Sequence, residues 1–192
     1  EKLSSSKLDW PVQLAFLDKV IDRVAAASHQ KKARRRTSVH EGTIDLWEKS
    51  LRATASHDLT LEVADGCVTA HAHMLMEASP VVQAMLASVM KEGKSQRIKL
   101  LDANSSAVAL FLEALYTSSA SDDPNYQTAL SALDIAHRWQ VEPVVEMLTD
   151  LIEPMITEES FLAIAEHAVL KNLDTLKKAC QKFGSECPAI QG

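Results

Sequence analysis

The stretch DLTLEVADGCVTA, residues 58–70, alternates apolar and polar side chains on both sides of an Asp65-Gly66 pair. A period of two puts every second side chain on the same face of a strand, and Asp-Gly is a common turn between antiparallel strands. The stretch therefore predicts a β-hairpin with strands over residues 59–63 and 67–70.

Helical patterns lie on both sides of this hairpin. Upstream, apolar residues at 44, 47 and 51 share one helix face and predict a helix over residues 43–52. Downstream we expect a helix at 73–77, and a second helix at 81–90 with Ser79 as its N-cap and Pro80 in its first position. A strand follows at 97–100, then a helix that is capped by residues 102–106 and ends near Tyr116, and then an exposed polar loop at 117–124. Further helices are expected at 126–139, 143–152, 158–170 and 174–183. Thr157 and Asp174 are the expected N-caps of the last two helices. The order predicts an α+β core with an α-helical extension.

Composition excludes several classes of function. Apolar residues make up 46% and charged residues 24% of the 192, which is typical of a soluble globular protein. The chain has only 5 glycines and contains neither of the glycine-rich motifs that bind nucleotide phosphates. No run approaches the roughly 20 apolar residues that span a bilayer, and residues 1–30 lack the apolar core of a signal peptide. We expect no nucleotide cofactor, no membrane partner, and a location in the nucleus and/or cytoplasm.

The cysteines and histidines do not form a recognisable reactive site. Three cysteines far apart in the sequence, Cys67, Cys180 and Cys187, indicate free thiols in a reducing compartment. Cys67, His71 and His73 resemble part of a zinc ligand set, but no fourth ligand is near, and structural roles are favoured for them. Nucleophile motifs are absent as well. The sequence therefore predicts a protein that is not an enzyme and has no catalytic residues, metal or cofactor.

Charge is divided unevenly along the chain. Residues 1–57 carry 11 Lys+Arg against 7 Asp+Glu, whereas residues 58–192 carry 9 against 19. The resulting net charges are +4 and −10. Because a body of charge −10 repels a phosphate backbone, we do not expect the larger part to bind nucleic acid.

The first part combines an amphipathic pattern with a basic cluster. Five apolar residues at 4-3-4-3 spacing predict a helix that either packs on its own domain or forms an intermolecular seam, namely Trp10, Leu14, Leu17, Ile21 and Val24. Residues 28–42 read as a linker and contain the cluster Lys31, Lys32, Arg34, Arg35 and Arg36. This cluster fits a solvated linker, a nuclear-import signal or an anionic-surface contact. Ser38, which follows it, stands in a sequence typical of a basophilic kinase site.

Residues from about 58 to 152 resemble the BTB (POZ) domain family. The similarity rests on an ordered set of segments: DLTLEV at 58–63, Asp65-Gly66, Ala70-His71, Leu75, Ser79-Pro80, Ala84-Met85-Leu86, Met90-Lys91-Glu92, Ile98-Lys99-Leu100, Phe111-Leu112, Leu115-Tyr116-Thr117, Leu133, Ala136 and Val141. The helices after residue 158 are similar to the start of the BACK or three-box region that follows many BTB domains. The overall likeness is closest to speckle-type BTB proteins, although residues 1–57 do not resemble the MATH domain of those proteins.

Four positions depart from the family pattern. Ala72 stands where a basic residue is frequent, Val82 where an aromatic one is usual, and Leu86 where Phe is common. Ser118 replaces the glycine expected after Leu115-Tyr116-Thr117. The two core changes keep apolar volume and should preserve the core. Ala72, however, supplies no basic partner for Asp58 at the dimer seam.

The resemblance implies a binding module that homodimerises and acts as a substrate adaptor for a cullin-RING ubiquitin ligase. In the cullin-binding subset a hydrophobic-x-Glu motif follows the third helix, and Met90, Lys91 and Glu92 match it. A flexible Met can fill an apolar groove while a Glu accepts hydrogen bonds. The expected dimer residues are Ile44, Trp47, Leu51, Asp58 and Leu59. The alternative is an oligomerisation scaffold in a transcriptional or cytoskeletal complex without a ligase role.

The expected organisation therefore has three parts. Residues 1–57 form an N-terminal helical arm with its basic linker, 58–152 the BTB domain, and 153–192 the BACK-like extension. The expected partners are a second copy of the chain, a cullin scaffold and substrate proteins whose identity the sequence does not reveal.

Overall fold

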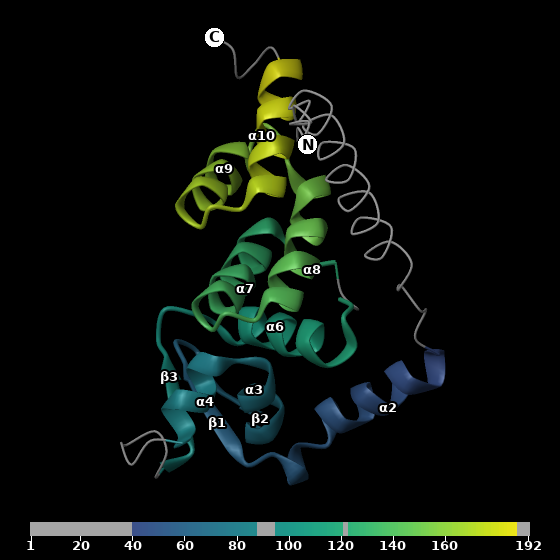
Figure 1. Ribbon diagram of the computed structural model, residues 1–192, viewed down its shortest axis with the longest axis vertical. Helices are drawn as coiled ribbons and strands as arrows, with labels where there is room; N and C mark the ends of the chain where they lie inside the picture. Colours follow the sequence, from purple (N-terminus) through teal and green to yellow (C-terminus); the bar gives the residue numbers. More distant parts are fainter. Residues whose placement is uncertain (1–39, 88–94, 121–122, 188–192) are drawn as a thin grey trace, which may run out of the picture. The chain divides into compact units, whose positions relative to one another are not determined.

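The computed structural model describes residues 40–87, 95–120 and 123–187 of the chain (Figure 1). Every element described below belongs to the compact unit Glu41–Gly192. A small three-stranded sheet lies at one end of this unit, and helices make up the rest. The α+β class with a helical extension is confirmed.

The sheet is built around the predicted hairpin. Strands β1 (Leu59–Val63) and β2 (Gly66–Ala70) are antiparallel, and β3 (Arg97–Leu100) pairs with β1 in parallel, so the order is β2-β1-β3. Gly66 has a φ of 151°, a backbone conformation that favours glycine, and it lets β2 start one residue earlier than expected. The pattern of period two in β1 buries Leu59, Leu61 and Val63 on one face.

Two short helices follow the hairpin, α3 (Ala72–Ala78) and α4 (Pro80–Ala87). Ser79 lies between them and is fully buried. Its hydroxyl oxygen accepts a hydrogen bond from the Val82 N–H at 3.0 Å, so Ser79 caps α4 as the sequence indicated. The same hydroxyl donates to the carbonyl of Trp139 at 2.6 Å, which ties the start of α4 to a distant helix.

Helix α6 (Ser105–Thr117) forms the centre of the unit. Asn104 caps it through the Ala107 N–H, and Asp65 of the hairpin turn accepts hydrogen bonds from the Ser105 N–H and hydroxyl, each at 2.7 Å. These bonds lower the pKa of Asp65, because they favour its charged form. Eight residues of α6 are buried, and only the face that carries Ser106 and Ala109 is exposed. It contacts α2 (Glu41–Arg52), β2, α7 (Tyr126–Arg138) and α8 (Glu142–Ile152).

The extension is a helical hairpin. After the short 3-10 turn η2 (Glu153–Met155), helix α9 (Phe161–Leu170) and helix α10 (Asp174–Glu186) pack against each other. Asn172 has a φ of 55°, and the Leu173 N–H donates to the carbonyl of Ala168, which closes α9 in the manner of a Schellman motif. None of the helices in the described ranges is long and apolar enough to cross a membrane.

Two expectations about this hairpin were wrong in detail. Helix α9 begins at Phe161 rather than 158, because Thr157 and Ser160 form a separate turn in which the Thr157 side chain accepts from the Ser160 N–H. Asp174 is the first residue of α10, and the N-cap is Leu173, which makes no side-chain cap bond. The carboxylate of Asp174 instead forms an ion pair with Lys177, three residues further along the helix.

Ser118, which stands where a glycine is expected, has a left-handed backbone conformation. It follows α6 with a φ of 53° and ψ of 32°, and its N–H donates to the carbonyl of Ala114 at 2.9 Å. A left-handed conformation is unfavourable for a residue with a Cβ. The position therefore carries strain that a glycine would not have.

We predict that Ser118→Gly raises the free energy of unfolding by about 0.5–1 kcal/mol. Chemical denaturation monitored by circular dichroism measures the change. The control is Ser106→Gly, on the exposed side of α6 where the conformation is helical; this variant should lose stability, because glycine costs more backbone entropy there. Equal destabilisation by both variants would contradict the account of Ser118.

Candidate protein-interaction surfaces

Helix α2 presents one apolar face to its own chain and another to solvent. It contacts α6, with Leu51 packed against the core and Ile44 half-buried. Trp47 is 39% exposed and Leu46 is 63% exposed. Sequence reasoning missed Leu46, because it falls outside the 44-47-51 stripe that predicts the helix. The apolar surface available to a partner is therefore centred on Leu46 and Trp47.

The two remaining residues expected at the dimer seam, Asp58 and Leu59, have different environments. Leu59 is 1% exposed and belongs to the core of its own chain. Asp58 is exposed, and its Oδ1 accepts a hydrogen bond from the Ala72 N–H at 2.6 Å. The carboxylate thus satisfies one of the free N–H groups at the start of α3, where negative charge is favourable. In this chain the partner of Asp58 is a backbone group rather than a basic side chain.

A hydrogen-bonded chain around His71 fastens the segment between α2 and β1 to the core. The Ser56 hydroxyl donates to the Ala53 carbonyl at 2.7 Å, so its oxygen is left to accept from His71 Nε2–H at 2.9 Å. His71 Nδ1 then accepts from the Tyr116 hydroxyl at 2.8 Å, and that oxygen accepts from the His71 N–H at 3.3 Å. Burial raises the pKa of Tyr116, which keeps the phenol a donor.

His57 packs beside His71 and also contacts β2. Its Nδ1 lies 2.8 Å from the Thr69 hydroxyl of β2, and its ring packs edge-on against His71 with centroids 4.6 Å apart. His57 Nε2 is buried and has no hydrogen-bond partner. Within the described ranges no three His, Cys, Asp or Glu side chains are placed to hold a metal ion. His71 holds the fold together here, whereas Cys67 is exposed on β2.

We predict that Tyr116→Phe lowers the free energy of unfolding by about 1–2 kcal/mol, because the His71 N–H and imidazole lose their shared partner. Thermal and chemical denaturation measure the loss. Tyr126 is the other tyrosine of the chain, and its hydroxyl makes no hydrogen bond to another described residue, so Tyr126→Phe should leave stability almost unchanged. If the two variants are equally stable, the hydrogen-bonded chain does not fasten this segment.

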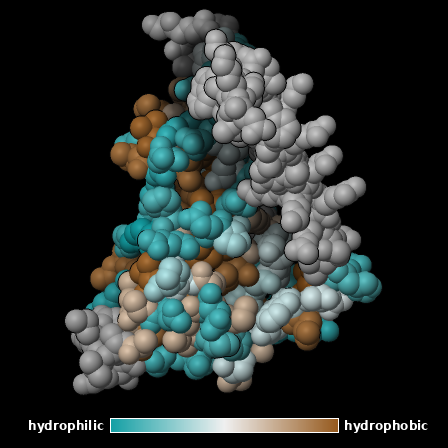
Figure 2. All heavy atoms as spheres, in the orientation of Figure 1, coloured by the Kyte–Doolittle hydropathy of each residue, from teal (hydrophilic) through white to brown (hydrophobic). Residues whose placement is uncertain are grey.

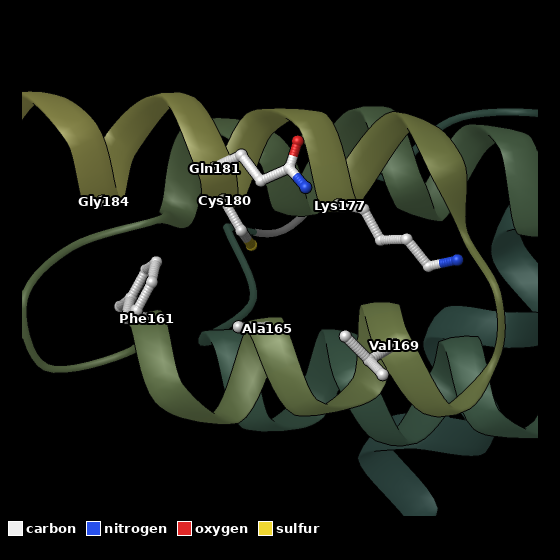
Figure 3. A pocket seen from close by; sticks show the side chains of 7 residues that line it. All are labelled: Phe161, Ala165, Val169, Lys177, Cys180, Gln181 and Gly184. Carbon is white, nitrogen blue, oxygen red and sulfur yellow. The ribbon is translucent and has the colours of Figure 1, made fainter.

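A second apolar surface lies on the helical extension. Helices α9 and α10 line an open pocket of about 260 Å³, with Phe161, Ala165 and Val169 on one side and Cys180 and Gly184 on the other (Figure 3). A Cβ on Gly184 would lie 3.4 Å from the Phe161 ring, at ordinary van der Waals contact, so the two helices approach closely here. Burial raises the pKa of the Cys180 thiol and keeps it neutral.

The outer face of α9 extends this apolar surface. Leu162, Val169 and Leu170 are each at least 66% exposed, and Figure 2 shows hydrophobic residues gathered over this part of the molecule. Large apolar side chains that gather on a surface are a mark of protein-binding sites. The described residues thus offer apolar faces on α2 and on α9, the properties of a protein-interaction domain.

Comparison with known proteins identifies the domain. Residues 48–156 match the model of the BTB/POZ domain, and the chain belongs to this family. It is 29% identical over 126 residues to Kelch-like protein 7 of Homo sapiens and of Rattus norvegicus, covering 66% of this chain and 21% of each relative. It is 25% identical over 142 residues to BTB/POZ and TAZ domain-containing protein 4 of Arabidopsis thaliana, covering 73% and 38%. The chain spans about a fifth of the Kelch-like relatives. The BTB resemblance is confirmed, and the speckle-type likeness is not.

Several predicted sites lie outside the described residues. They are the amphipathic segment from Trp10 to Val24, the basic cluster at 31–36, Ser38, and the motif Met90, Lys91 and Glu92. The last of these follows α4 (Pro80–Ala87) in the sequence. Val82 and Leu86 are buried and hold α4 in the core.

Proposed function

We propose that this chain is a non-enzymatic BTB adaptor module that homodimerises and joins a cullin scaffold to substrate proteins. The observation that carries the proposal is the match to the BTB/POZ domain over more than half of the chain, with apolar helix faces that have no partner among the described residues. Its localisation, in nucleus and/or cytoplasm, is part of the same proposal.

The dimer seam is proposed on α2. Leu46 and Trp47 are the large apolar side chains that α2 leaves exposed, and burying both against a second copy removes apolar area from water. Ile44 and Leu51 support the helix from the side of α6 and would contribute at the edge. Asp58 lies just after the helix, where its hydrogen bond to α3 fixes the start of β1. Leu59 is buried in the core of its own chain, so it would support the seam without contacting the second copy.

The scaffold contact is proposed at Met90, Lys91 and Glu92, with the helices at 157–183 adding surface. Met90 supplies a flexible apolar side chain and Glu92 an acceptor, the combination that fills a groove and fixes its orientation. The pocket between α9 and α10 supplies further apolar area that a partner segment would cover. Two separate parts of the chain would thus hold one scaffold.

An oligomerisation scaffold without a ligase role is the alternative function. The exposed α2 face supports it equally well, because self-association is common to both proposals. Only scaffold binding separates them. Nuclear import through Lys31 to Arg36, and its regulation by phosphorylation of Ser38, are further proposals that rest on the sequence.

We predict a dimer whose dissociation constant rises at least about 30-fold in Leu46→Asp and in Trp47→Asp, because each places a charge in an apolar contact. Sedimentation equilibrium measures the change. Leu162→Asp is the control, since Leu162 is an exposed apolar residue on α9, and it should leave the dimer intact. A wild-type chain that stays monomeric at tens of micromolar would refute the proposed seam.

Binding to the N-terminal domain of a BTB-specific cullin tests the adaptor role. We expect micromolar or tighter binding by calorimetry, with a loss of about tenfold or more in Glu92→Ala, because a central acceptor is removed. Glu146→Ala, at an exposed position of α8, is the matched control and should bind like wild type. No binding by the wild type, or unchanged binding by Glu92→Ala, would favour the scaffold alternative.

A further inference from the structure

The carboxyl end of α7 is joined to the helical extension by ion pairs. Asp134 accepts from the Lys171 ammonium group, which lies at the end of α9, and from Arg138 Nε at 3.0 Å. Arg138 in turn donates through Nη1 to Asp102 at 2.6 Å, in the turn between β3 and α6. One group of four charged side chains therefore connects the extension, α7 and the edge of the sheet.

Trp139, the residue that follows α7, is hydrogen-bonded to the start of α4. The carbonyl of Trp139 accepts the Ser79 hydroxyl, and the Ser79 oxygen accepts the Val82 N–H. Both Ser79 and Trp139 are buried, and Trp139 packs edge-on against Phe111 of α6 with ring centroids 5.3 Å apart. Trp139 is therefore a rigid point to which the start of α4 is attached.

We propose that residues 134–139 are a common anchor that holds α4 and the α9–α10 hairpin in a fixed position relative to each other. This inference rests on the proposed function, in which the segment after α4 and the surface of α9–α10 bind the same scaffold. Two surfaces that bind one rigid partner gain affinity when their relative position is set beforehand, because less conformational freedom is lost on binding. Lys171 and Ser79 act as positioning residues for that contact.

Among the described residues, the side chain of Lys171 is less exposed than those of Lys177, which is 25% exposed, and Lys99, which also form ion pairs. The Lys171 side chain is 15% exposed, whereas Lys99, which lies 3.7 Å from Glu62 on the sheet, is 63% exposed. Exposed ion pairs contribute little because water and salt screen them, and a partly buried pair is screened less. Loss of Lys171 should therefore loosen the extension, while loss of Lys99 should not.

The test combines hydrogen exchange with scaffold binding. In Lys171→Met the amides of α9 and α10 should exchange faster, and Lys171→Arg, which keeps the charge, should restore wild-type exchange. In Ser79→Ala the faster exchange should be confined to α4. Each single variant should bind the cullin N-terminal domain about fivefold more weakly. Lys99→Met is the control and should match wild type in both measurements.

The double variant provides the decisive comparison. Because either single variant already removes this fixed relative position, the double variant should lose less affinity than the product of the two single losses. Losses that multiply would overturn the common anchor, and so would unchanged exchange in Lys171→Met. If wild type binds no scaffold, the proposed function fails together with the anchor's role in it, whereas the exchange data still decide whether residues 134–139 hold both elements.

Discussion

Phe111 and seven other residues of α6 are buried, and the other described elements pack around them. A helix with so many apolar side chains has to be covered on most of its faces, because leaving those faces in water forfeits the free energy of burial. Helices α2, α7 and α8 and strand β2 contact it from different directions. Asp65 of the hairpin turn is hydrogen-bonded to the first residue of α6. His71 is hydrogen-bonded to Tyr116 in the last turn of α6.

The exposed apolar surfaces lie on α2 and α9, near the two ends of the described part of the chain. Helix α2 covers α6 with only one side and exposes Leu46 and Trp47, and α9 buries only Ile164 and Ala168 of its ten residues. The elements nearest α6 therefore supply rigidity, while those farther along the chain carry exposed apolar area. Such a division suits a module that binds other proteins. The end of α7 connects the two, since Trp139 packs on Phe111 while Asp134 holds the extension.

Local patterns predict most of the elements, because their causes are local. The period-two alternation and the Asp65-Gly66 turn predict the hairpin, and Ser79 and Asn104 mark helix starts through caps that lie within three residues. The start of α9 was misplaced because Thr157 and Ser160 bond to each other in a turn that the helical pattern conceals. Contacts between distant residues, such as Lys171 with Asp134 or Ser79 with Trp139, have no signal in a single sequence. For the same reason the sequence does not predict the exposure of Leu46, which depends on which face of α2 contacts α6. The family resemblance depends on an ordered set of residues and was correct at the level of the BTB domain, whereas its finer speckle-type form had no such support.

The most direct measurement is the structure of this chain in complex with the N-terminal domain of a BTB-specific cullin. We predict that Met90 and Glu92 lie in the interface, that the scaffold also covers the pocket between α9 and α10, and that a second copy of the chain contacts Leu46 and Trp47. A scaffold bound across α2, or a complex in which residues 90–92 and the α9–α10 hairpin both face solvent, would contradict the account.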